Sequence, residues 1–214
     1  MTPKQPRSGA SRPSTKKSPA VHKPAAHAAH EIRIIGGQWK RTKLKVLDKP
    51  GLRPTPDRVR ETLFNWLGQD LTGWKVLDAF AGTGALGFEA ASRGAKDATL
   101  VEQDSALVAQ LQKLKAQLQA EALRVQRGDG VAAIAQAAPG SLHLILLDPP
   151  FDADLFGPSL RHCARALAAD GWVYLEAPRA WSEDELAALG LRLHRHLKAG
   201  MVHAHLLAPL GTTA

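Results

Sequence analysis

The chain has 214 residues, a net charge of +8 and 44% hydrophobic residues, which suits one globular domain of about 150 to 200 residues with an added segment. Its single cysteine, Cys163, excludes an internal disulfide and fits a reducing cytosol. No apolar run reaches the ~18 residues of a membrane helix and no signal-peptide core opens the chain, so we expect a cytoplasmic protein without a membrane partner.

The positive charge is concentrated in the front of the chain. Residues 1–61 hold 15 Lys and Arg against 4 Asp and Glu, a net +11, so the remainder carries 8 − 11 = −3. A basic front end on a weakly acidic body predicts a polyanionic partner for the N-terminal part. Residues 1–30 contain no acidic residue and are rich in Pro, Ala, Ser and Lys, which predicts a disordered tail that either holds RNA weakly or only aids solubility.

Residues 31–70 are expected to form a β-hairpin followed by a helix. Apolar and basic residues alternate over Glu31–Ile35 and Gln38–Val46, on either side of Gly36-Gly37. The polar face of this hairpin would carry Arg33, Lys40, Arg41, Lys43 and Lys45, with Trp39 near the turn. One sign of charge beside an aromatic ring favours nucleic-acid contact over a merely solvated face.

The helix of this unit is expected over residues 55–67. Thr55 as N-cap, Pro56 at the first helical position and Asp57 in the first turn indicate its start. Gly68 indicates its end. The stiff Arg53-Pro-Thr55 entry would also bring Arg53 and the Thr55 hydroxyl beside a ligand.

From residue 71 to residue 214 the pattern alternates between strands and helices, which predicts right-handed crossovers and a doubly wound parallel sheet. Strands are expected near 75–79, 97–102, 123–127, 142–147 and 171–176, and helices near 84–93, 104–120, 130–138, 155–168 and 182–189. Asp104 is expected to cap the second of these helices, with Leu107, Leu111, Leu114 and Leu118 on its buried face.

The end of the chain breaks this alternation. Residues 191–197 and 201–209 read as a closing antiparallel hairpin that bears His194, His196, His203 and His205. Alternate positions on a solvated sheet face explain these histidines better than a metal site, because no Cys or acidic ligand lies near them in the sequence. We therefore expect no metal.

A glycine-rich turn follows the first strand of the sheet. Gly82, Gly84 and Gly87 satisfy G-x-G-x-x-G, a pattern that alone would suggest a dinucleotide. Asp78 at the strand tip would repel a pyrophosphate, however, and would hold an ammonium group. Glu102 ends the second strand, where a carboxylate accepts ribose hydroxyls, and Asp129 follows the third, where it would accept an adenine amino group. A ligand with an ammonium group, ribose hydroxyls and an adenine amino group matches these three carboxylates, and S-adenosylmethionine carries all three groups.

The fourth strand ends in Leu144-Ile-Leu-Leu-Asp-Pro-Pro-Phe151. Four aliphatic residues in a row fit a strand buried on both faces. Proline cannot donate to a ladder, so the strand stops at Asp148. A carboxylate, a stiff turn and a ring then lie at the carboxyl edge of the sheet, where ligands of open α/β sheets bind.

With these residues assembled, the chain resembles the class I S-adenosylmethionine-dependent methyltransferases, and Asp148-Pro-Pro-Phe151 is similar to the motif of those that methylate an exocyclic or amide nitrogen. More narrowly, it resembles the bacterial 16S ribosomal RNA guanine-N2 methyltransferases of the RsmD type. That resemblance rests on Arg33-Ile-Ile-Gly-Gly-Gln-Trp39, Gly51-Leu-Arg-Pro-Thr55, residues 57–66 and residues 78–87. It runs from about Ile32 through Pro178.

The resemblance implies a Rossmann-like methyltransferase fold with a seven-stranded, mostly parallel sheet, a monomer, and the small ribosomal subunit as partner. The cofactor contacts it implies are Asp78, Phe80, Ala81, Gly82, Thr83, Gly84, Glu102, Asp129 and Gly130, with Arg53 and Thr55 at the methionine end. The catalytic group would be Asp148, Pro149, Pro150 and Phe151, and the RNA contacts Arg33, Trp39, Lys40, Arg41 and Lys43.

Other readings stay open at this point. A DNA adenine or protein glutamine nitrogen methyltransferase would use the same Asp-Pro-Pro-Phe turn, and the basic hairpin disfavours protein without separating RNA from DNA. An NAD-dependent oxidoreductase would use the same glycine turn. For an amine substrate, we expect Asp148 and a carbonyl of the Pro-Pro turn to accept its two N–H bonds, while Phe151 stacks on the extruded base.

Overall fold

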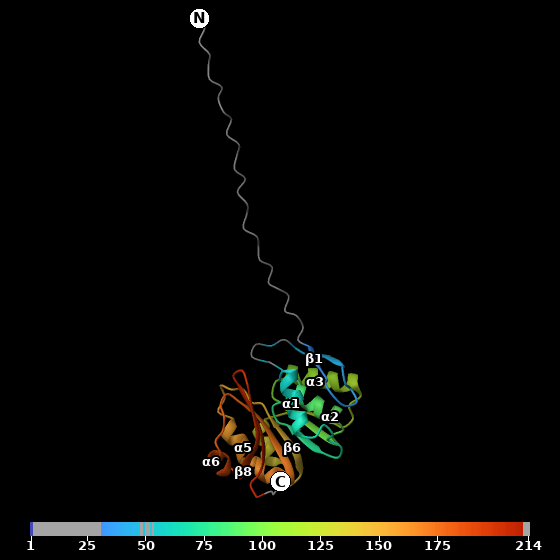
Figure 1. Cartoon of the computed structure of the whole chain (residues 1–214). Coiled ribbons are helices and arrows are strands. Elements are labelled where there is room, and N and C mark those ends of the chain that lie inside the picture. Colours follow the sequence, from blue (N-terminus) through green and yellow to red (C-terminus); the bar gives the residue numbers. More distant parts are fainter. Residues whose placement is uncertain (2–30, 48, 50–51, 53, 212–214) are drawn as a thin grey trace.

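The computed structural model describes residues 1, 31–47, 49, 52 and 54–211. The tail expected over residues 1–30 therefore lies, apart from Met1, outside the described residues, as does Arg53. Figure 1 shows the whole chain, with the described elements gathered around one central sheet.

The central sheet has seven strands in the order β5-β4-β3-β6-β7-β9-β8. The strands are β3 (Lys75–Asp78), β4 (Asp97–Glu102), β5 (Leu123–Arg127), β6 (Leu142–Leu147), β7 (Leu167–Ala177), β8 (Leu191–Ala199) and β9 (Val202–Pro209). β3 to β7 run parallel, and β9 pairs antiparallel with both β7 and β8. The predicted Rossmann-like fold with its closing antiparallel hairpin is confirmed.

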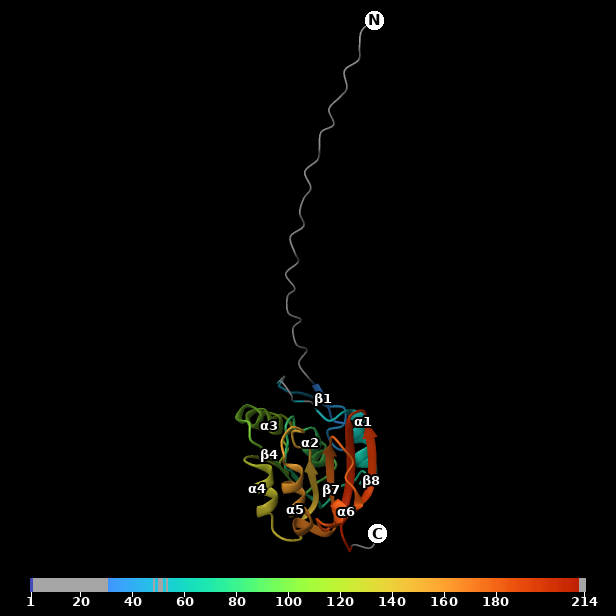
Figure 2. The same ribbon diagram turned by 90° about the vertical axis from the view of Figure 1, so that its left-hand side faces the viewer.

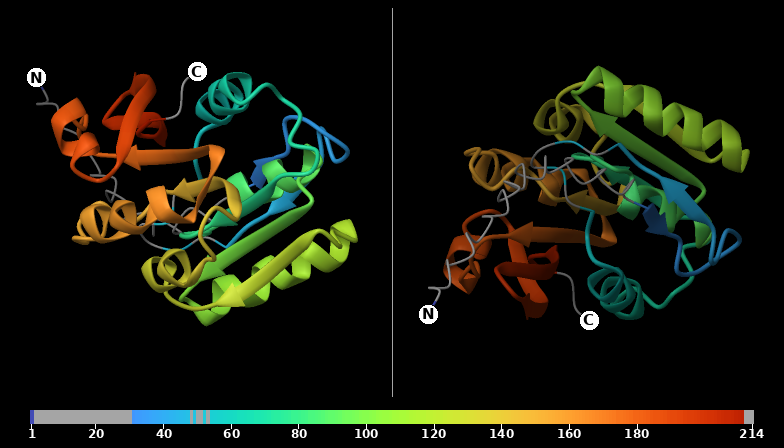
Figure 3. Two further views of the ribbon diagram at one scale, coloured as in Figure 1. Left: turned by 90° about the horizontal axis from the view of Figure 1, so that it is seen from below. Right: turned by 90° about the horizontal axis from the view of Figure 1, so that it is seen from above.

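Six helices of the described chain cover the two faces of this sheet. The first face carries α1 (Asp57–Trp66), α2 (Ala85–Ser92) and α3 (Ser105–Leu118), and the second α4 (Gly130–Gln136), α5 (Phe156–Ala166) and α6 (Glu183–Ala187). Figures 2 and 3 show the resulting three layers from three further directions. No helix in the described part of the chain is long and apolar enough to cross a membrane.

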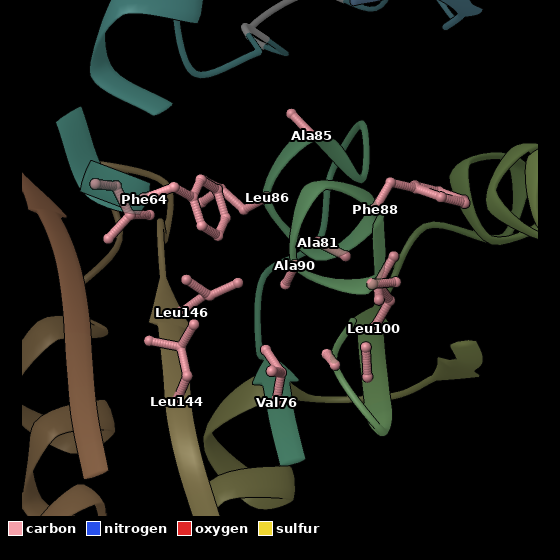
Figure 4. Packing of buried hydrophobic residues seen from close by; sticks show 14 of the residues in the cluster. Phe64, Val76, Ala81, Ala85, Leu86, Phe88, Ala90, Leu100, Leu144 and Leu146 are labelled. Carbon is pink, nitrogen blue, oxygen red and sulfur yellow. The ribbon is translucent and has the colours of Figure 1, made fainter. Parts of the chain in front are cut away.

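β6 lies in the middle of the sheet, and its side chains alternate between two hydrophobic cores. Leu144 and Leu146 belong to the core beneath α1 and α2, where Phe64 lies near them (Figure 4). Ile145 and Leu147 belong to the core on the other face. All four leucine and isoleucine side chains are fully buried. The predicted two-sided burial is confirmed, and it fixes the position at which the strand delivers Asp148.

The start of α1 differs from the prediction. The helix begins at Asp57 with Pro56 at the N-cap, and no side chain caps it. Thr55 is buried instead, and its hydroxyl hydrogen-bonds to Glu176. The predicted cap is wrong because a carboxylate from a distant strand competes for the hydroxyl. By contrast, Asp104 caps α3 as predicted, accepting from the backbone N–H groups of Ala106 and Leu107.

The N-terminal hairpin is shorter than predicted. Only β1 (Glu31–Arg33) and β2 (Lys43–Lys45) are strands. Gly36 and Gly37 do not form a two-residue turn, since the loop they begin is bonded to α2. Backbone N–H groups of Ile35 and Gly36 donate to the Glu89 carboxylate at 2.9 and 2.7 Å. A Cβ on Gly37 would lie 1.8 Å from the Ser92 carbonyl oxygen, so only glycine fits there.

The histidines of the closing hairpin do not share one solvated face, which corrects the expectation. The Nε2 of His196 and the Nδ1 of His203 lie 3.0 Å apart on the exposed side. His205 is fully buried, and its Nε2 accepts the backbone N–H of Trp181 at 3.2 Å. A register shift between Leu193 and Arg195 interrupts the alternation of β8. In the described residues, no group of three or more His, Cys, Asp or Glu side chains could hold a metal.

Candidate active site

Four carboxylates gather at the carboxyl edge of the sheet. β3 ends in Asp78, β4 ends in Glu102, β6 is followed by Asp148, and β7 carries Glu176 near its end. The register pairs Asp78 with Leu146 and Leu147 with Leu175, so Asp148 and Glu176 follow directly on adjacent parallel strands. This edge is the one at which open α/β sheets bind ligands.

The glycine-rich turn crosses this edge between β3 and α2. Gly82 and Gly84 have φ angles of 51° and 82°, which glycine adopts without strain. Gly87 packs so closely that a Cβ there would lie 2.5 Å from Leu100. The side chain of Leu52 covers the turn, 3.2 Å from where a Cβ of Gly82 would lie. The turn therefore presents backbone rather than side chains to a ligand.

Asp78 is a buried acid without a cationic partner among the described residues. It is 2% exposed, and it accepts the backbone N–H of Gly87 at 3.0 Å. Burial raises its pKa to about 7, the Gly87 hydrogen bond opposes this, and the nearby Glu102 carboxylate adds to it. A cationic ligand group beside Asp78 would supply the missing charge.

Glu102 and Asp129 both hold backbone groups in the structure. Glu102 accepts the N–H of Gly82 and the N–H of Asp104, each at 2.9 Å. Asp129 is the N-cap of α4, and its second oxygen accepts from the Gln103 amide at 3.0 Å. A Cβ on Gly130 would lie 2.1 Å from the Ala79 carbonyl oxygen, so this glycine lets α4 approach the sheet. Each carboxylate keeps free lone pairs for a ligand.

The segment Asp148–Phe151 leaves the sheet as a stiff turn. Pro149 is buried and Pro150 is exposed, and the Pro150 carbonyl accepts the N–H of Ala153 at 3.1 Å. The ring of Phe151 is 41% exposed, unusually open for a large apolar side chain. Burial raises the pKa of Asp148 well above its usual range, and the charges of Glu176 and Asp78 raise it further.

Glu176 is the site residue that the sequence reading missed. It is 3% exposed, and burial raises its pKa. The Tyr174 hydroxyl donates to its Oε1 at 2.9 Å, and Thr55 bonds to it from the entry of α1. Its signal in the sequence was an acid within the otherwise apolar run Trp172–Ala177. Only the pairing of β6 with β7 brings that acid beside Asp148.

The remaining predicted contacts fall into two groups. Near the glycine turn, Thr83 is buried, Ala81 is buried and Phe80 is half-buried against the second core. On the hairpin, Arg33 pairs with Asp57 at 2.9 Å and Lys43 with Glu31 at 3.1 Å.

The other basic residues of the predicted RNA face are not in ion pairs with described residues. Lys40, Arg41 and Lys45 have no acidic partner in the described chain, so no described carboxylate offsets their positive charge. Trp39 is half-buried against the first core, and its backbone N–H donates to the Ser92 hydroxyl.

Comparison with known proteins gives consistent matches across nearly the whole described chain. The family model described as "Conserved hypothetical protein 95" matches residues 32–208. Ribosomal RNA small subunit methyltransferase D of Escherichia coli (strain K12) is 42% identical over 189 residues, which are 85% of this chain and 92% of that relative.

Solved structures agree in fold. That of yhhF from Escherichia coli is 40% identical with a TM-score of 0.71, and the match covers 84% of this chain and 98% of that one. A solved structure from Haemophilus influenzae is 31% identical with a TM-score of 0.70, over 85% of this chain and 99% of that one. The chain therefore belongs to the family of ribosomal RNA small subunit methyltransferase D.

Proposed function

We propose that this protein transfers a methyl group from S-adenosylmethionine to the exocyclic N2 amine of a guanine in the 16S ribosomal RNA of the small subunit. The observation that carries the proposal is the half-buried Asp148 carboxylate, with its raised pKa, followed by a Pro-Pro turn and an exposed ring. The name of the 42% identical Escherichia coli relative supports ribosomal RNA as the substrate class.

The carboxyl edge fits S-adenosylmethionine, which when bound supplies an electrophilic methyl group. Asp78, buried without a cation among the described residues, would hold the amino group of the methionine end. Glu102 would accept the ribose hydroxyls and Asp129 the adenine amino group, through lone pairs that their backbone contacts leave free. The backbone of residues 80–84 would line the cofactor, and Arg53 and Thr55 would approach its methionine end.

The chemical task of the protein is to position a weak nucleophile, because the lone pair of a guanine amine is delocalised into its ring. Asp148 and the Pro149 carbonyl accept the two N–H bonds of the amine, which favours a pyramidal nitrogen and aims its lone pair. The carboxylate also stabilises positive charge that develops on the nitrogen. Phe151 stacks on the extruded base.

The proton released from the methylated nitrogen passes to Asp148. Burial and the neighbouring Glu176 raise the pKa of Asp148 well above its usual range, which makes its carboxylate a better proton acceptor than an exposed aspartate. Tyr174 and Thr55 hold Glu176 in place through hydrogen bonds. The Glu176 carboxylate therefore stays close enough to Asp148 to raise its pKa.

Replacing Asp148 tests the assignment. We expect Asp148→Ala to lower methyl transfer at least about 100-fold, the scale on which preorganised electrostatic groups act, while S-adenosylmethionine affinity stays within a few-fold. The substrate is small ribosomal subunits from cells that lack this gene, the readout is mass mapping of methylguanosine, and calorimetric titration reports cofactor binding. Normal turnover by the variant would remove Asp148 from the mechanism.

The same assay separates the competing substrate classes. Duplex DNA and a glutamine-containing peptide are offered in parallel with the ribosomal particles, and NAD is titrated beside S-adenosylmethionine. Methylation of DNA or peptide without methylation of the particles would reject the RNA proposal and leave a nitrogen methyltransferase. Binding of NAD without binding of S-adenosylmethionine would reject the RNA proposal and any other nitrogen methyltransferase.

A further inference from the structure

A cleft lies next to the candidate active site, between the two segments that leave β6 and β7. It has a volume of about 520 Å³ and is lined by residues 151–154, 156 and 157 on one side and by Pro178, Arg179 and Trp181 on the other. Phe151 follows Asp148 by three residues, and Pro178 follows Glu176 by two. The cleft is therefore formed by the segments that directly follow these two carboxylates.

Flat rings form the walls of this cleft. Phe151 and Phe156 contact each other with centroids 6.2 Å apart and ring planes tilted by 48°. On the opposite side, the Arg179 guanidinium lies over the Trp181 ring, 4.6 Å from its centroid. Exposed rings and a stacked guanidinium are the surfaces on which unpaired nucleobases stack.

The negative charge of the cleft favours the hydrogen-bond donors on the edge of a nucleobase and disfavours a phosphate group. Asp152 and Asp154 lie among its lining residues, and the Arg179 charge is already balanced by Glu185, which it contacts at 2.7 and 3.1 Å. The cleft is therefore acidic, although the predicted partner of the protein is a polyanion. Carboxylates accept hydrogen bonds from exocyclic amino groups, which guanine, adenine and cytosine carry on their edges and uracil lacks.

The tryptophan wall is held in a fixed position. The backbone N–H of Trp181 donates to Nε2 of the buried His205 at 3.2 Å. Burial lowers the pKa of His205 to about 4, so at neutral pH this nitrogen is free of a proton and accepts. The next residue, Ser182, starts α6 through a reciprocal capping box with Glu185. A stacking surface that is already ordered loses little entropy when a base arrives.

We infer that this cleft binds an unpaired nucleobase next to the target guanine in the RNA, one that carries an exocyclic amino group. The inference rests on the proposed function for the identity of the target. The cleft is lined by residues that follow Asp148 and not by Asp148 itself, so a base seated there leaves the carboxylate to the target. Phe151 stands between the two bases and contacts both.

Nucleoside titrations test the cleft without any methyl transfer. Guanosine, adenosine, cytidine and uridine are titrated while the indole N–H resonance of Trp181 is followed by NMR, with Trp181→Phe used to assign that resonance. We expect the three amine-bearing nucleosides to shift it and uridine to bind several-fold more weakly. The exposed Asp154→Asn variant should bring the four affinities close together. No shift with any nucleoside, or unchanged discrimination in Asp154→Asn, would overturn the inference.

Kinetics on small ribosomal subunits form the second arm. We expect Trp181→Ala to raise the KM for the particles about tenfold, the equivalent of one lost stacking contact, with kcat and the KM for S-adenosylmethionine within about twofold. Trp181→Phe keeps a ring and should stay near the parent enzyme. An unchanged KM in a folded Trp181→Ala variant would argue against the cleft. Particles left unmethylated by the parent enzyme would reject the proposed function and leave the nucleoside result standing.

Discussion

Asp78 illustrates how a residue proposed to bind a ligand lowers the stability of the protein that carries it. Its pKa is about 7 in the folded protein against 3.8 for an ordinary aspartate. Between these two values the folded state binds more protons than the unfolded state, so stability falls as the pH rises from about 4 to 7. The difference corresponds to a cost of up to about 4 kcal/mol at pH 8.

Replacing Asp78 by asparagine should therefore stabilise the protein and impair binding. Asparagine keeps an oxygen for the Gly87 N–H but carries no charge to bury. We expect Asp78→Asn to raise the free energy of unfolding at pH 8 by about 1–4 kcal/mol and to leave it nearly unchanged at pH 4. The affinity for S-adenosylmethionine should fall about 10- to 100-fold. Urea unfolding at both pH values and calorimetric titration measure the two effects, and a variant less stable at pH 8 would contradict the first.

Replacing Glu176 should change how methyl transfer depends on pH. The Glu176 charge raises the pKa of Asp148, so Glu176→Gln should lower it. Because Asp148 must be ionised to accept the amine in the proposed mechanism, the acidic limb of the pH–rate profile should move to lower pH in the variant. Glutamine can still accept from Tyr174, so the fold is kept. Methyl transfer measured across the pH range checks the shift, and an acidic limb that stays in place would exclude electrostatic coupling between the two acids.

At the scale of elements, α2 links the cofactor turn to the basic hairpin. Glu89 on this helix is fully buried and pairs with Arg60 of α1 at 3.2 Å and with Arg93 at 2.8 Å. The same carboxylate accepts the two hairpin N–H groups described above. One side chain thus holds three segments, and the glycine-rich turn begins the helix that carries it.

Loss of the Glu89 charge should be costly. We expect Glu89→Gln to lower the free energy of unfolding by about 3–5 kcal/mol, because two buried guanidinium groups would lose their common counter-ion. Asp57→Asn is the matched control, since Asp57 also contacts Arg60 but is 42% exposed at its side chain, and its replacement should cost below about 1 kcal/mol. Chemical denaturation of the two variants compares them directly, and equal costs would count against the buried network.

The elements show which kind of information the sequence holds. β6 was predictable because four aliphatic residues and two prolines act locally on strand and turn. Asp104 was predictable as a cap for the same reason. The Gly36-Gly37 loop was not, since its hydrogen-bond partners lie in α2, more than 50 residues later. The position of Glu176 beside Asp148 could be predicted only with the strand order of the sheet. The burial of His205 likewise depends on the insertion of β9 between β7 and β8.

For the whole molecule, the separation of charge predicts how RNA binding depends on salt. Lys40, Arg41 and Lys45 lack acidic partners in the described chain, whereas Lys43 and Arg33 are paired. Replacing these three with glutamine should reduce the slope of log K against log salt by about 2, at roughly 0.7 per contact with a single strand. Lys75, Lys96 and Arg124 lie where β3, β4 and β5 begin, at the edge of the sheet opposite to the carboxyl edge that holds Asp148. Replacing these three with glutamine should leave the slope unchanged. Filter binding of 16S ribosomal RNA over a salt series provides both slopes, and equal slopes in the two triple variants would remove the hairpin from the RNA interface.

The position of β9 has a consequence for the newly made chain. β9 is synthesised after every other described strand, yet it fills the gap between β7 and β8 and is paired on both sides. Until it emerges, β7 has an open edge and the Trp181 N–H lacks its His205 acceptor. Domains assemble during translation as their segments become available. The half of the sheet that holds Asp78 and Glu102 can therefore form while the chain is still attached to a ribosome, and the wall beside Asp148 is completed only after β9 has left the exit tunnel.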